Sequence, residues 1–378
     1  MSSISGASGF HLTAAGGPLL RQPLAPLVPR PDEVVVEVAG CGLCHTDIGF
    51  AYGGVPTRHP LPLVLGHEIA GRVVAAGEGK QEWLGRSVVV PAVIACGECE
   101  ACRAGRPTIC RKQFMPGNDG DGGFASHVLL PARGLCPVPD TLPAGTTLEM
   151  LSVVADAVTT PYEAVDRAGV GSNDIAVFVG AGGVGGFGVQ IAAAAGASVV
   201  AIDVDAARLE LASRHGAVLT LNAKDLNPKE LKAKIRALSS ETGRGRTGLK
   251  IFETSGTTAG QQTAFGLLDF GGYLAVVGFT PEKVEVRLSN LMAFDATARG
   301  NWGCAPEKYP AALQLVLDGK VALAPYVEMH SLDELPDLFE AAKNHKVRLR
   351  PVLVPGAAQT GVSVPHEQAG ALQGAARS

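Results

Sequence analysis

Residues 174–204 read DIAVFVGAGGVGGFGVQIAAAAGASVVAIDV, which predicts a strand, a glycine-rich turn, a helix of small residues and a second strand. Gly180, Gly182 and Gly185 fit the pattern G-x-G-x-x-G in the strand-to-helix context that dinucleotide binding requires. Glycines there permit the tight turn, the approach of backbone to a pyrophosphate, and close packing of helix on strand. The unpaired N–H groups at the helix start attract phosphate. The residues expected to contact the coenzyme here are Gly180, Gly182, Gly183, Val184 and Gly185.

Asp203 ends the second predicted strand, 18 residues after Gly185. An acidic residue at this place accepts hydrogen bonds from the adenosine ribose hydroxyls and repels a 2′-phosphate. The sequence therefore predicts that the chain binds NAD in preference to NADP. A glycine-rich turn that serves packing alone is the competing interpretation, but the strand, the turn, the helix and the acidic residue together argue against it.

Strands alternate with helices around this stretch, which indicates an α/β fold with a doubly wound parallel sheet. We place this dinucleotide-binding domain at residues 157–303. The chain before it is rich in short strands and turns, and the chain after it returns to mixed structure with a closing strand, VRLRPVLVP. The first domain is therefore predicted to be discontinuous and to comprise residues 1–156 and 304–378. Residues 356–378 are small and polar, and we expect a tail that is mobile or lies on a neighbouring subunit.

The composition excludes several classes of protein. Hydrophobic residues make up 46% of the 378 residues and charged residues 18%, which supplies a large core and rules out a disordered chain. No run of about 18 apolar residues occurs, so we expect no membrane span, and the net charge of −4 argues against nucleic-acid binding. The N-terminus lacks an export signal, so a cytoplasmic location is expected, where the eight cysteines favour metal binding over disulfides.

Four of the cysteines follow one another with the spacing C-x2-C-x2-C-x7-C. They are Cys96, Cys99, Cys102 and Cys110. This spacing can place four thiolates around one tetrahedral zinc ion, which closes the site to substrate. We therefore predict a structural zinc lobe over about residues 94–112. A redox pair, two disulfides and an iron–sulfur cluster are the alternatives.

A second set of possible metal ligands lies in two short motifs, Cys44-His-Thr-Asp47 and Gly66-His-Glu68. Each motif stands at the end of a predicted strand. A cysteine and a histidine about twenty residues apart can converge on one ion if those strands are neighbours. Taken alone, such a pair is more often structural than catalytic.

Together and in this order, the motifs resemble those of the zinc-dependent medium-chain dehydrogenase/reductase (alcohol dehydrogenase) superfamily, over nearly the whole chain. The resemblance implies a GroES-like β-rich catalytic domain, a Rossmann coenzyme domain and an active-site cleft between them. It also implies one catalytic and one structural zinc ion per chain, and hydride transfer between NAD and an alcohol or ketone. Cys44 and His67 match catalytic zinc ligands, Glu68 matches a residue that can enter the coordination sphere, and Asp47 matches an acid that orients His67.

The third zinc ligand departs from the family pattern, which has a cysteine where this chain has Asp156. Zinc accepts carboxylate oxygen, and an aspartate keeps the charge of the ligand set unchanged. We therefore expect Asp156 to be the third ligand, and its harder oxygen can alter the Lewis acidity of the metal. The competing interpretation is that Asp156 caps the helix that follows and that the metal site is weak or empty.

The resemblance also assigns roles around the coenzyme and the substrate. Thr46 matches the hydroxyl that bridges the substrate oxygen to the nicotinamide ribose. The relay histidine of the family is replaced by Gly49, so the proton must leave by water or through a side chain such as His59. Arg350 matches an arginine that reaches the pyrophosphate, although an ordinary surface arginine is the alternative. The coenzyme contacts implied in this way are His45, Arg208, Val277 and Arg350.

With Asp156 and Gly49 taken together, the chain looks most like the 6-hydroxycyclohex-1-ene-1-carbonyl-CoA dehydrogenases of anaerobic benzoyl-CoA breakdown. That resemblance implies oxidation of a cyclic hydroxy-enoyl-CoA to its 6-oxo product. Conjugate reduction of an enone or enoyl-CoA, another zinc alcohol dehydrogenase activity, and a non-enzymatic nucleotide-binding scaffold are the alternatives. The family also implies a homodimer or homotetramer. The basic residues that could meet CoA phosphates are Arg58, His59, Arg111 and Lys112.

Overall fold

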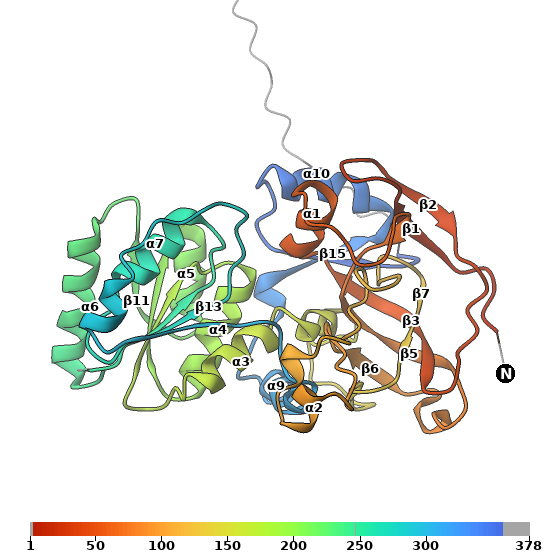
Figure 1. Ribbon diagram of the computed structural model, residues 1–378, viewed down its shortest axis with the longest axis horizontal. Coiled ribbons are helices and arrows are strands. Elements are labelled where there is room, and N and C mark those ends of the chain that lie inside the picture. Colours follow the sequence, from red (N-terminus) through yellow and green to blue (C-terminus); the bar gives the residue numbers. More distant parts are fainter. Residues whose placement is uncertain (1–2, 246, 358–378) are drawn as a thin grey trace, which may run out of the picture.

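A computed structural model describes residues 3–245 and 247–357. A half built on a parallel sheet and a β-rich half lie side by side (Figure 1). The predicted α/β fold, with its doubly wound sheet and separate β-rich part, is confirmed. Most of the predicted tail, residues 358–378, lies outside the described residues. Within the described ranges, no helix is long and apolar enough to cross a membrane.

The parallel-sheet half contains six strands in the order β11-β10-β9-β12-β13-β14, and every neighbouring pair is parallel. β9 (Ile175–Val179) lies inside the sheet, and all its residues are buried, as expected for a strand covered on both faces. The strand order reverses between β9 and β12, and ligands bind at such a switch point. The other strands are β10 (Ser198–Asp203), β11 (Ala217–Asn222), β12 (Lys250–Glu253), β13 (Tyr273–Val276) and β14 (Thr297–Gly300).

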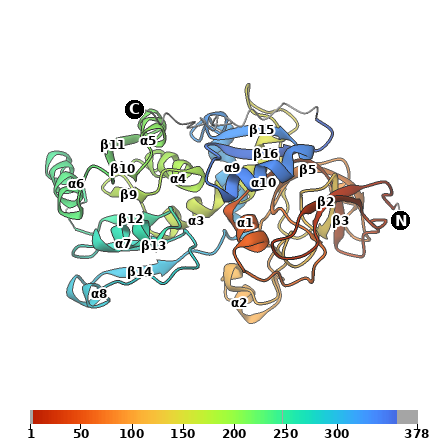
Figure 2. The ribbon, with the colours of Figure 1, turned by 90° about the horizontal axis from the view of Figure 1, so that it is seen from above.

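Helices cover both faces of this sheet (Figure 2). On one face, Phe178 of β9 belongs to the same apolar core as residues of three helices, α3 (Thr159–Arg167), α4 (Gly183–Ala194) and α5 (Ala206–Arg214). On the other face, Val177 joins a core with α6 (Pro228–Thr242) and α7 (Thr258–Gly266). This burial on two faces fixes the ends of the strands, where ligands bind in sheets of this kind.

The β-rich half is organised around β3 (Glu33–Gly42), which pairs antiparallel with β5, β7 and β16. Since β16 (Arg350–Val354) comes from the end of the chain, the C-terminal segment completes a sheet that the N-terminal segment begins. A discontinuous first domain requires this pairing, although its boundaries at residues 156 and 304 stay a prediction. The remaining strands are β1 (Ser8–Leu12), β2 (Leu19–Pro23), β4 (Leu63–Val64), β5 (Glu68–Ala76), β6 (Ser87–Val90), β7 (His127–Pro131), β8 (Cys136–Pro137) and β15 (Val327–Ser331).

Buried polar contacts tie the segment that follows β14 to the β-rich part of the chain. Tyr309, which begins α9, donates from its hydroxyl to the main-chain oxygen of Ala155 at 2.5 Å. The same hydroxyl accepts from the main-chain N–H of Ala92 at 3.1 Å. These bonds fix the chain just before Asp156, which is the residue expected to complete the metal site. The helices not yet given are α1 (His45–Tyr52), α2 (Glu100–Arg103), α8 (Ser289–Ala293), α9 (Tyr309–Leu317) and α10 (Leu335–Lys343).

Candidate active site

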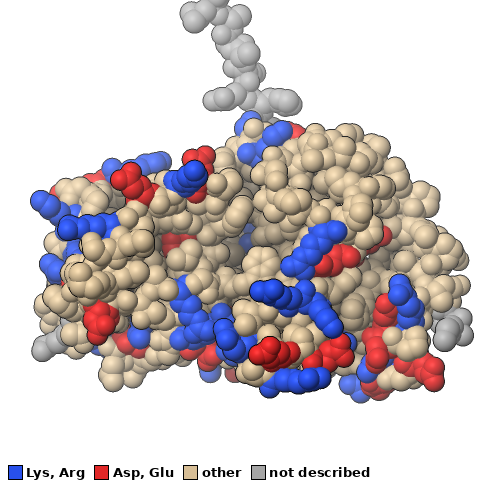
Figure 3. Space-filling model, in the orientation of Figure 1, with Lys and Arg blue, Asp and Glu red and all other residues tan. Residues whose placement is uncertain are grey.

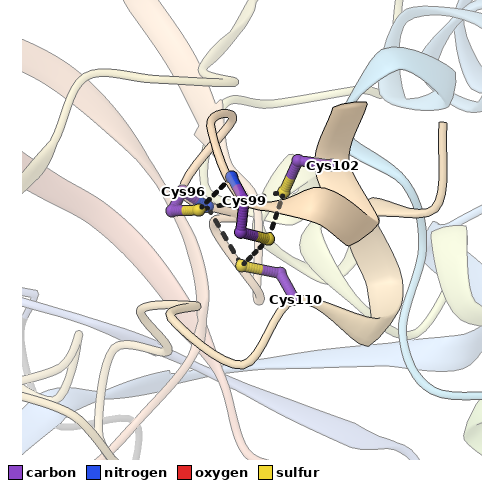
Figure 4. Close-up of side chains that lie close together, drawn as sticks. All are labelled: Cys96, Cys99, Cys102 and Cys110. Atoms are coloured by element: carbon purple, nitrogen blue, oxygen red, sulfur yellow. Dashed lines mark hydrogen bonds between the residues drawn. The ribbon is translucent and has the colours of Figure 1, made fainter. Parts of the chain in front are cut away.

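The four lobe cysteines point toward one another (Figure 4). Cys99 Sγ lies 3.5 Å from Cys102 Sγ and 3.7 Å from Cys110 Sγ, and Cys96 Sγ lies 3.9 Å from Cys102 Sγ. Four thiolates at about 2.3 Å from a tetrahedral zinc ion stand about 3.8 Å apart. A disulfide needs about 2.05 Å between sulfurs. The lobe therefore fits a zinc ion and does not fit the two disulfides that were the alternative.

Main-chain N–H groups prepare the lobe for a cation. The N–H of Cys99 donates to Cys96 Sγ at 3.4 Å, and the N–H of Cys96 donates to Cys110 Sγ at 3.4 Å. Hydrogen bonds from the backbone at Glu98 and Cys99 lower the pKa of Cys96 to about 6, despite some desolvation. Thiolates are the form that binds zinc, so these backbone hydrogen bonds favour the binding form of Cys96.

Cys44, His67 and Asp156 meet at a second point, although they are far apart in the sequence. Gly42, the last residue of β3, pairs with Glu68, the first residue of β5, and this pairing brings the Cys44 and His67 motifs together. Asp156 Oδ2 lies 3.9 Å from Cys44 Sγ and 3.6 Å from His67 Nε2. On a tetrahedral zinc ion the sulfur and oxygen donors would stand about 3.6 Å apart and the nitrogen and oxygen donors about 3.4 Å apart, so a small contraction around an ion would complete the site.

Asp47 is hydrogen-bonded to both motifs. This fully buried carboxylate accepts from the main-chain N–H of Cys44 at 3.0 Å and of Gly66 at 3.2 Å. Its Oδ1 also lies 3.3 Å from His67 Nδ1, which leaves Nε2 facing Asp156. Burial opposes charge on the ring, but Asp47 and Asp156 raise the pKa of His67 well above its usual value. An arrangement that favours a proton at Nε2 also favours a metal cation there.

Asp156 is not the N-cap of the helix that follows it. Asp156 follows a short 3-10 helix, Met150–Ala155, and α3 starts at Thr159 with Val158 in the N-cap position and no side-chain cap. The carboxylate instead accepts a hydrogen bond from the Thr160 hydroxyl through Oδ1. Thr160 was not singled out from the sequence. The competing interpretation of Asp156 as an N-cap therefore finds no support in the geometry, while its role as a metal ligand stays a prediction.

Glu68 and Arg350 form an ion pair inside the protein. Arg350 Nη1 donates to Glu68 Oε1 at 2.6 Å and to the main-chain oxygen of Leu43 at 3.4 Å. Burial raises the pKa of Glu68 to about 7, against the opposing charge of Arg350. Glu68 Oε2 and Arg350 Nε have no partner among the described residues. Arg350 is 8% exposed, so the alternative of an ordinary surface arginine does not hold.

A cleft of about 90 Å³ lies where α4 begins, and its lining includes His45, Gly183, Arg208 and Arg350. The sequence therefore predicted four residues that the structure does bring together. His345 also lines the cleft, and its ring stacks on that of His45 with the centroids 6.5 Å apart. Burial, with Arg350, His345 and Arg208 close by, lowers the pKa of His45. The cleft is electropositive and adjoins the helix N-terminus, as a pyrophosphate site requires.

The glycine-rich turn has the geometry that its motif predicts. Gly180 has a φ of 98°, and a side chain at Gly185 would stand 1.8 Å from the main-chain oxygen of Gly180. Asp203, at the end of β10, accepts from the N–H groups of Ala181 and Val204, each at 2.7 Å. These bonds hold the carboxylate beside the turn.

Three other predicted residues, Thr46, Val184 and Val277, lie outside the lining of this cleft. Thr46 Oγ1 lies 3.6 Å from Cys44 Sγ, so its hydroxyl lies beside the candidate metal ligands. Val184 lies in the first turn of α4, and Val277 follows β13 with its N–H bonded to the main-chain oxygen of Glu253 at 3.0 Å. Neither valine is among the residues that line the cleft.

Comparison with known proteins agrees with this geometry. The family model of the alcohol dehydrogenase GroES-like domain matches residues 30–140, and that of the zinc-binding dehydrogenase matches residues 183–318. An alcohol dehydrogenase of Geobacillus stearothermophilus is 30% identical over 323 residues, which are 85% of this chain and 91% of the relative.

Solved structures extend the likeness to the whole fold. The alcohol dehydrogenase of Aeropyrum pernix is similar at a TM-score of 0.81 and 28% identity, with 92% of this chain and 100% of that chain covered. A zinc-binding dehydrogenase from Sinorhizobium meliloti 1021, bound to NADP, gives a TM-score of 0.79 at 26% identity, with 94% and 100% covered. The chain belongs to the zinc-dependent medium-chain dehydrogenase/reductase (alcohol dehydrogenase) superfamily, and it is an oxidoreductase that acts on CH–OH donors.

Proposed function

We propose that this protein oxidises a secondary alcohol to a ketone with NAD, at a zinc ion held by Cys44, His67 and Asp156. The observation that carries the proposal is the meeting of these three ligand types at one point, with the pair Glu68–Arg350 joining that point to the coenzyme cleft. Zinc bound there would act as a Lewis acid on the substrate oxygen, and NAD in the cleft would accept the hydride.

The protein's own side chains have separate tasks in this proposal. Asp47 holds His67 in the orientation that presents Nε2 to the metal, and Thr46 receives the substrate's hydroxyl proton at Oγ1. Gly49 carries no side chain, and a Cβ atom there would meet only Val55, at 3.8 Å. No imidazole stands at this place, so we assign the onward transfer of the proton to water. Arg350, with its free Nε beside Gly183, holds the pyrophosphate.

The preference for NAD rests on Asp203. Its carboxylate lies at the end of β10, where a ribose hydroxyl can bond to it and a 2′-phosphate would be repelled. Arg208 stands 4.0 Å away and balances part of that charge. The competing coenzyme is NADP, and the ratio of kcat/KM for the two coenzymes decides between them.

We further propose that the substrate is 6-hydroxycyclohex-1-ene-1-carbonyl-CoA. Asp156 in the ligand set and Gly49 in the relay position support this choice. Figure 3 shows several Lys and Arg side chains gathered along the line where the two halves meet. Arg58 forms an ion pair with Asp119 at 3.2 Å, so its guanidinium already has an anionic partner.

The test is a substrate panel with the zinc-loaded protein and NAD. It contains the cyclic hydroxy-enoyl-CoA, the same alcohol as the free acid, and simple secondary alcohols. The proposal predicts the largest kcat/KM for the thioester and a product ketone that keeps its ring double bond. Oxidation of simple alcohols alone would remove the substrate assignment and leave the class. A saturated ring ketone formed from the enone and NADH would show conjugate reduction instead, and no turnover of any compound in the panel would contradict the proposed substrate.

We also propose a homodimer formed through the edge of the parallel sheet. β14 has one sheet neighbour, and all four of its residues are exposed. Leu288, Met292 and Trp302 nearby are exposed by 69%, 79% and 50%. An open strand edge flanked by apolar side chains is a typical site for pairing with another chain. Light scattering on the purified protein, with Ala298→Pro to block the edge, tests this contact, and a mass unaffected by the substitution would contradict it.

A further inference from the structure

The carboxylate of Asp156 uses its two oxygens differently. Oδ2 faces Cys44 Sγ and His67 Nε2, whereas Oδ1 accepts a hydrogen bond from Thr160 Oγ1. The hydroxyl therefore occupies the side of the carboxylate that points away from the cluster. No part of the activity proposed above assigns a role to Thr160.

Local structure fixes this hydroxyl. Thr160 follows Asp156 by four residues, and its N–H donates to the main-chain oxygen of Asp156 at 2.8 Å, so one helical turn joins the two. Thr160 is 8% exposed. The side-chain amide of Asn301 donates to the main-chain oxygen of Thr160 at 3.1 Å and to that of Gly303 at 3.2 Å. The turn is thereby tied to the segment that leaves β14.

A carboxylate needs this control more than a thiolate does. A cysteine offers zinc one donor atom, but an aspartate offers two oxygens and can bind through both. A catalytic zinc ion keeps one position open for water or substrate. If Asp156 bound through both oxygens, the second would occupy or crowd that position. A hydrogen bond that engages Oδ1 leaves Oδ2 alone as the ligand.

We infer that Thr160 is a positioning residue that makes Asp156 a one-oxygen metal ligand. This inference deepens the proposed function, because it requires Asp156 to bind the metal. Residues that hold a ligand in this way typically change metal affinity or activity by about 10–100-fold when they are lost.

The test compares Thr160→Val, which keeps the shape and removes the hydroxyl, with Thr160→Ser, which keeps the hydroxyl. Thr159→Val is the matched control, since Thr159 lies in the same turn of α3 but donates to the main-chain oxygen of Ala155 at 3.1 Å. The first readout is the d–d absorption spectrum of the cobalt-substituted protein, from which the spectrum of cobalt-substituted Asp156→Ala is subtracted. The second is the zinc affinity, measured in competition with a chelator. Both are independent of turnover.

Thr160→Val should lower the zinc affinity by about 10-fold or more and shift the cobalt bands toward the weaker absorption of a higher coordination number. Thr160→Ser and Thr159→Val should match the wild type. A wild-type spectrum and affinity in Thr160→Val would overturn the inference, as would equal impairment in Thr160→Ser. If Asp156→Ala itself keeps the cobalt spectrum, the ligand assignment fails and the proposed function with it. If Asp156→Ala loses the cobalt spectrum but Thr160→Val keeps it, only the role of Thr160 is overturned.

Discussion

Replacement of Arg350 with methionine separates two roles that the structure gives to one guanidinium. Nη1 stabilises the buried charge of Glu68 at 2.6 Å, and Nε lies beside Gly183 without a partner among the described residues, where a pyrophosphate would bind. Methionine fills a similar volume without charge. The variant therefore leaves Glu68 as a lone buried carboxylate and removes the contact to the coenzyme.

The two losses have different magnitudes. Removal of one partner from a buried ion pair typically costs about 3–5 kcal/mol of stability. Loss of a hydrogen bond to a charged group costs about 1.5–3 kcal/mol, which weakens NADH binding by about 10- to 150-fold. The pKa of Glu68 is already raised to about 7, and loss of Arg350 raises it further. A carboxyl whose pKa is higher in the folded than in the unfolded state lowers the free energy of unfolding as the pH rises. The destabilisation of Arg350→Met relative to the wild type should therefore be larger at pH 8 than at pH 6.

The assay pairs urea unfolding with a fluorescence titration of NADH, and it includes the double variant Arg350→Met/Glu68→Gln. The second change removes the lone charge, so the double variant should regain much of the lost stability and lose the added sensitivity to pH. Its affinity for NADH should stay as low as that of Arg350→Met. If the double variant recovered NADH affinity, or if Arg350→Met bound NADH like the wild type, the assignment of Arg350 to the pyrophosphate would be refuted.

Three further substitutions test other parts of the account. Asp203→Ser should raise kcat/KM for NADP relative to NAD by at least about 10-fold, because the charge that opposes a 2′-phosphate is gone; an unchanged ratio in the coenzyme assay would contradict this. Cys99→Ser should remove about one zinc ion per chain and lower the melting temperature, since the lobe loses a ligand; full zinc content by elemental analysis would contradict the lobe. Thr46→Val should lower kcat by about 100-fold while zinc content stays constant, and equal loss of both would make Thr46 structural.

Some parts of the site could be predicted because local chemistry alone defines them. The turn at Gly180 needs a positive φ, and Gly185 has no room for a side chain, so only glycine satisfies either position. The lobe cysteines lie close in sequence, and a single loop with a short helix brings them together. Asp203 follows from its distance along the chain after the turn.

Other parts depend on the packing of distant segments. Glu68 and Arg350 stand 282 residues apart, and only the pairing of β16 with β3 makes them neighbours. Asp156 could be predicted through family resemblance, but a lone aspartate carries no signal of its own. Thr160 and His345 were missed for the same reason, although His345 lies in a basic stretch that leads to Arg350.

The most direct test of the central claim is the zinc content of purified wild-type protein and of Asp156→Ala, measured by elemental analysis at equal protein concentration. If Cys44, His67 and Asp156 hold the catalytic metal, the wild type should contain about two zinc ions per chain and the variant about one, retained by the cysteine lobe. Equal zinc content in the two proteins would contradict the claim that Asp156 is a ligand.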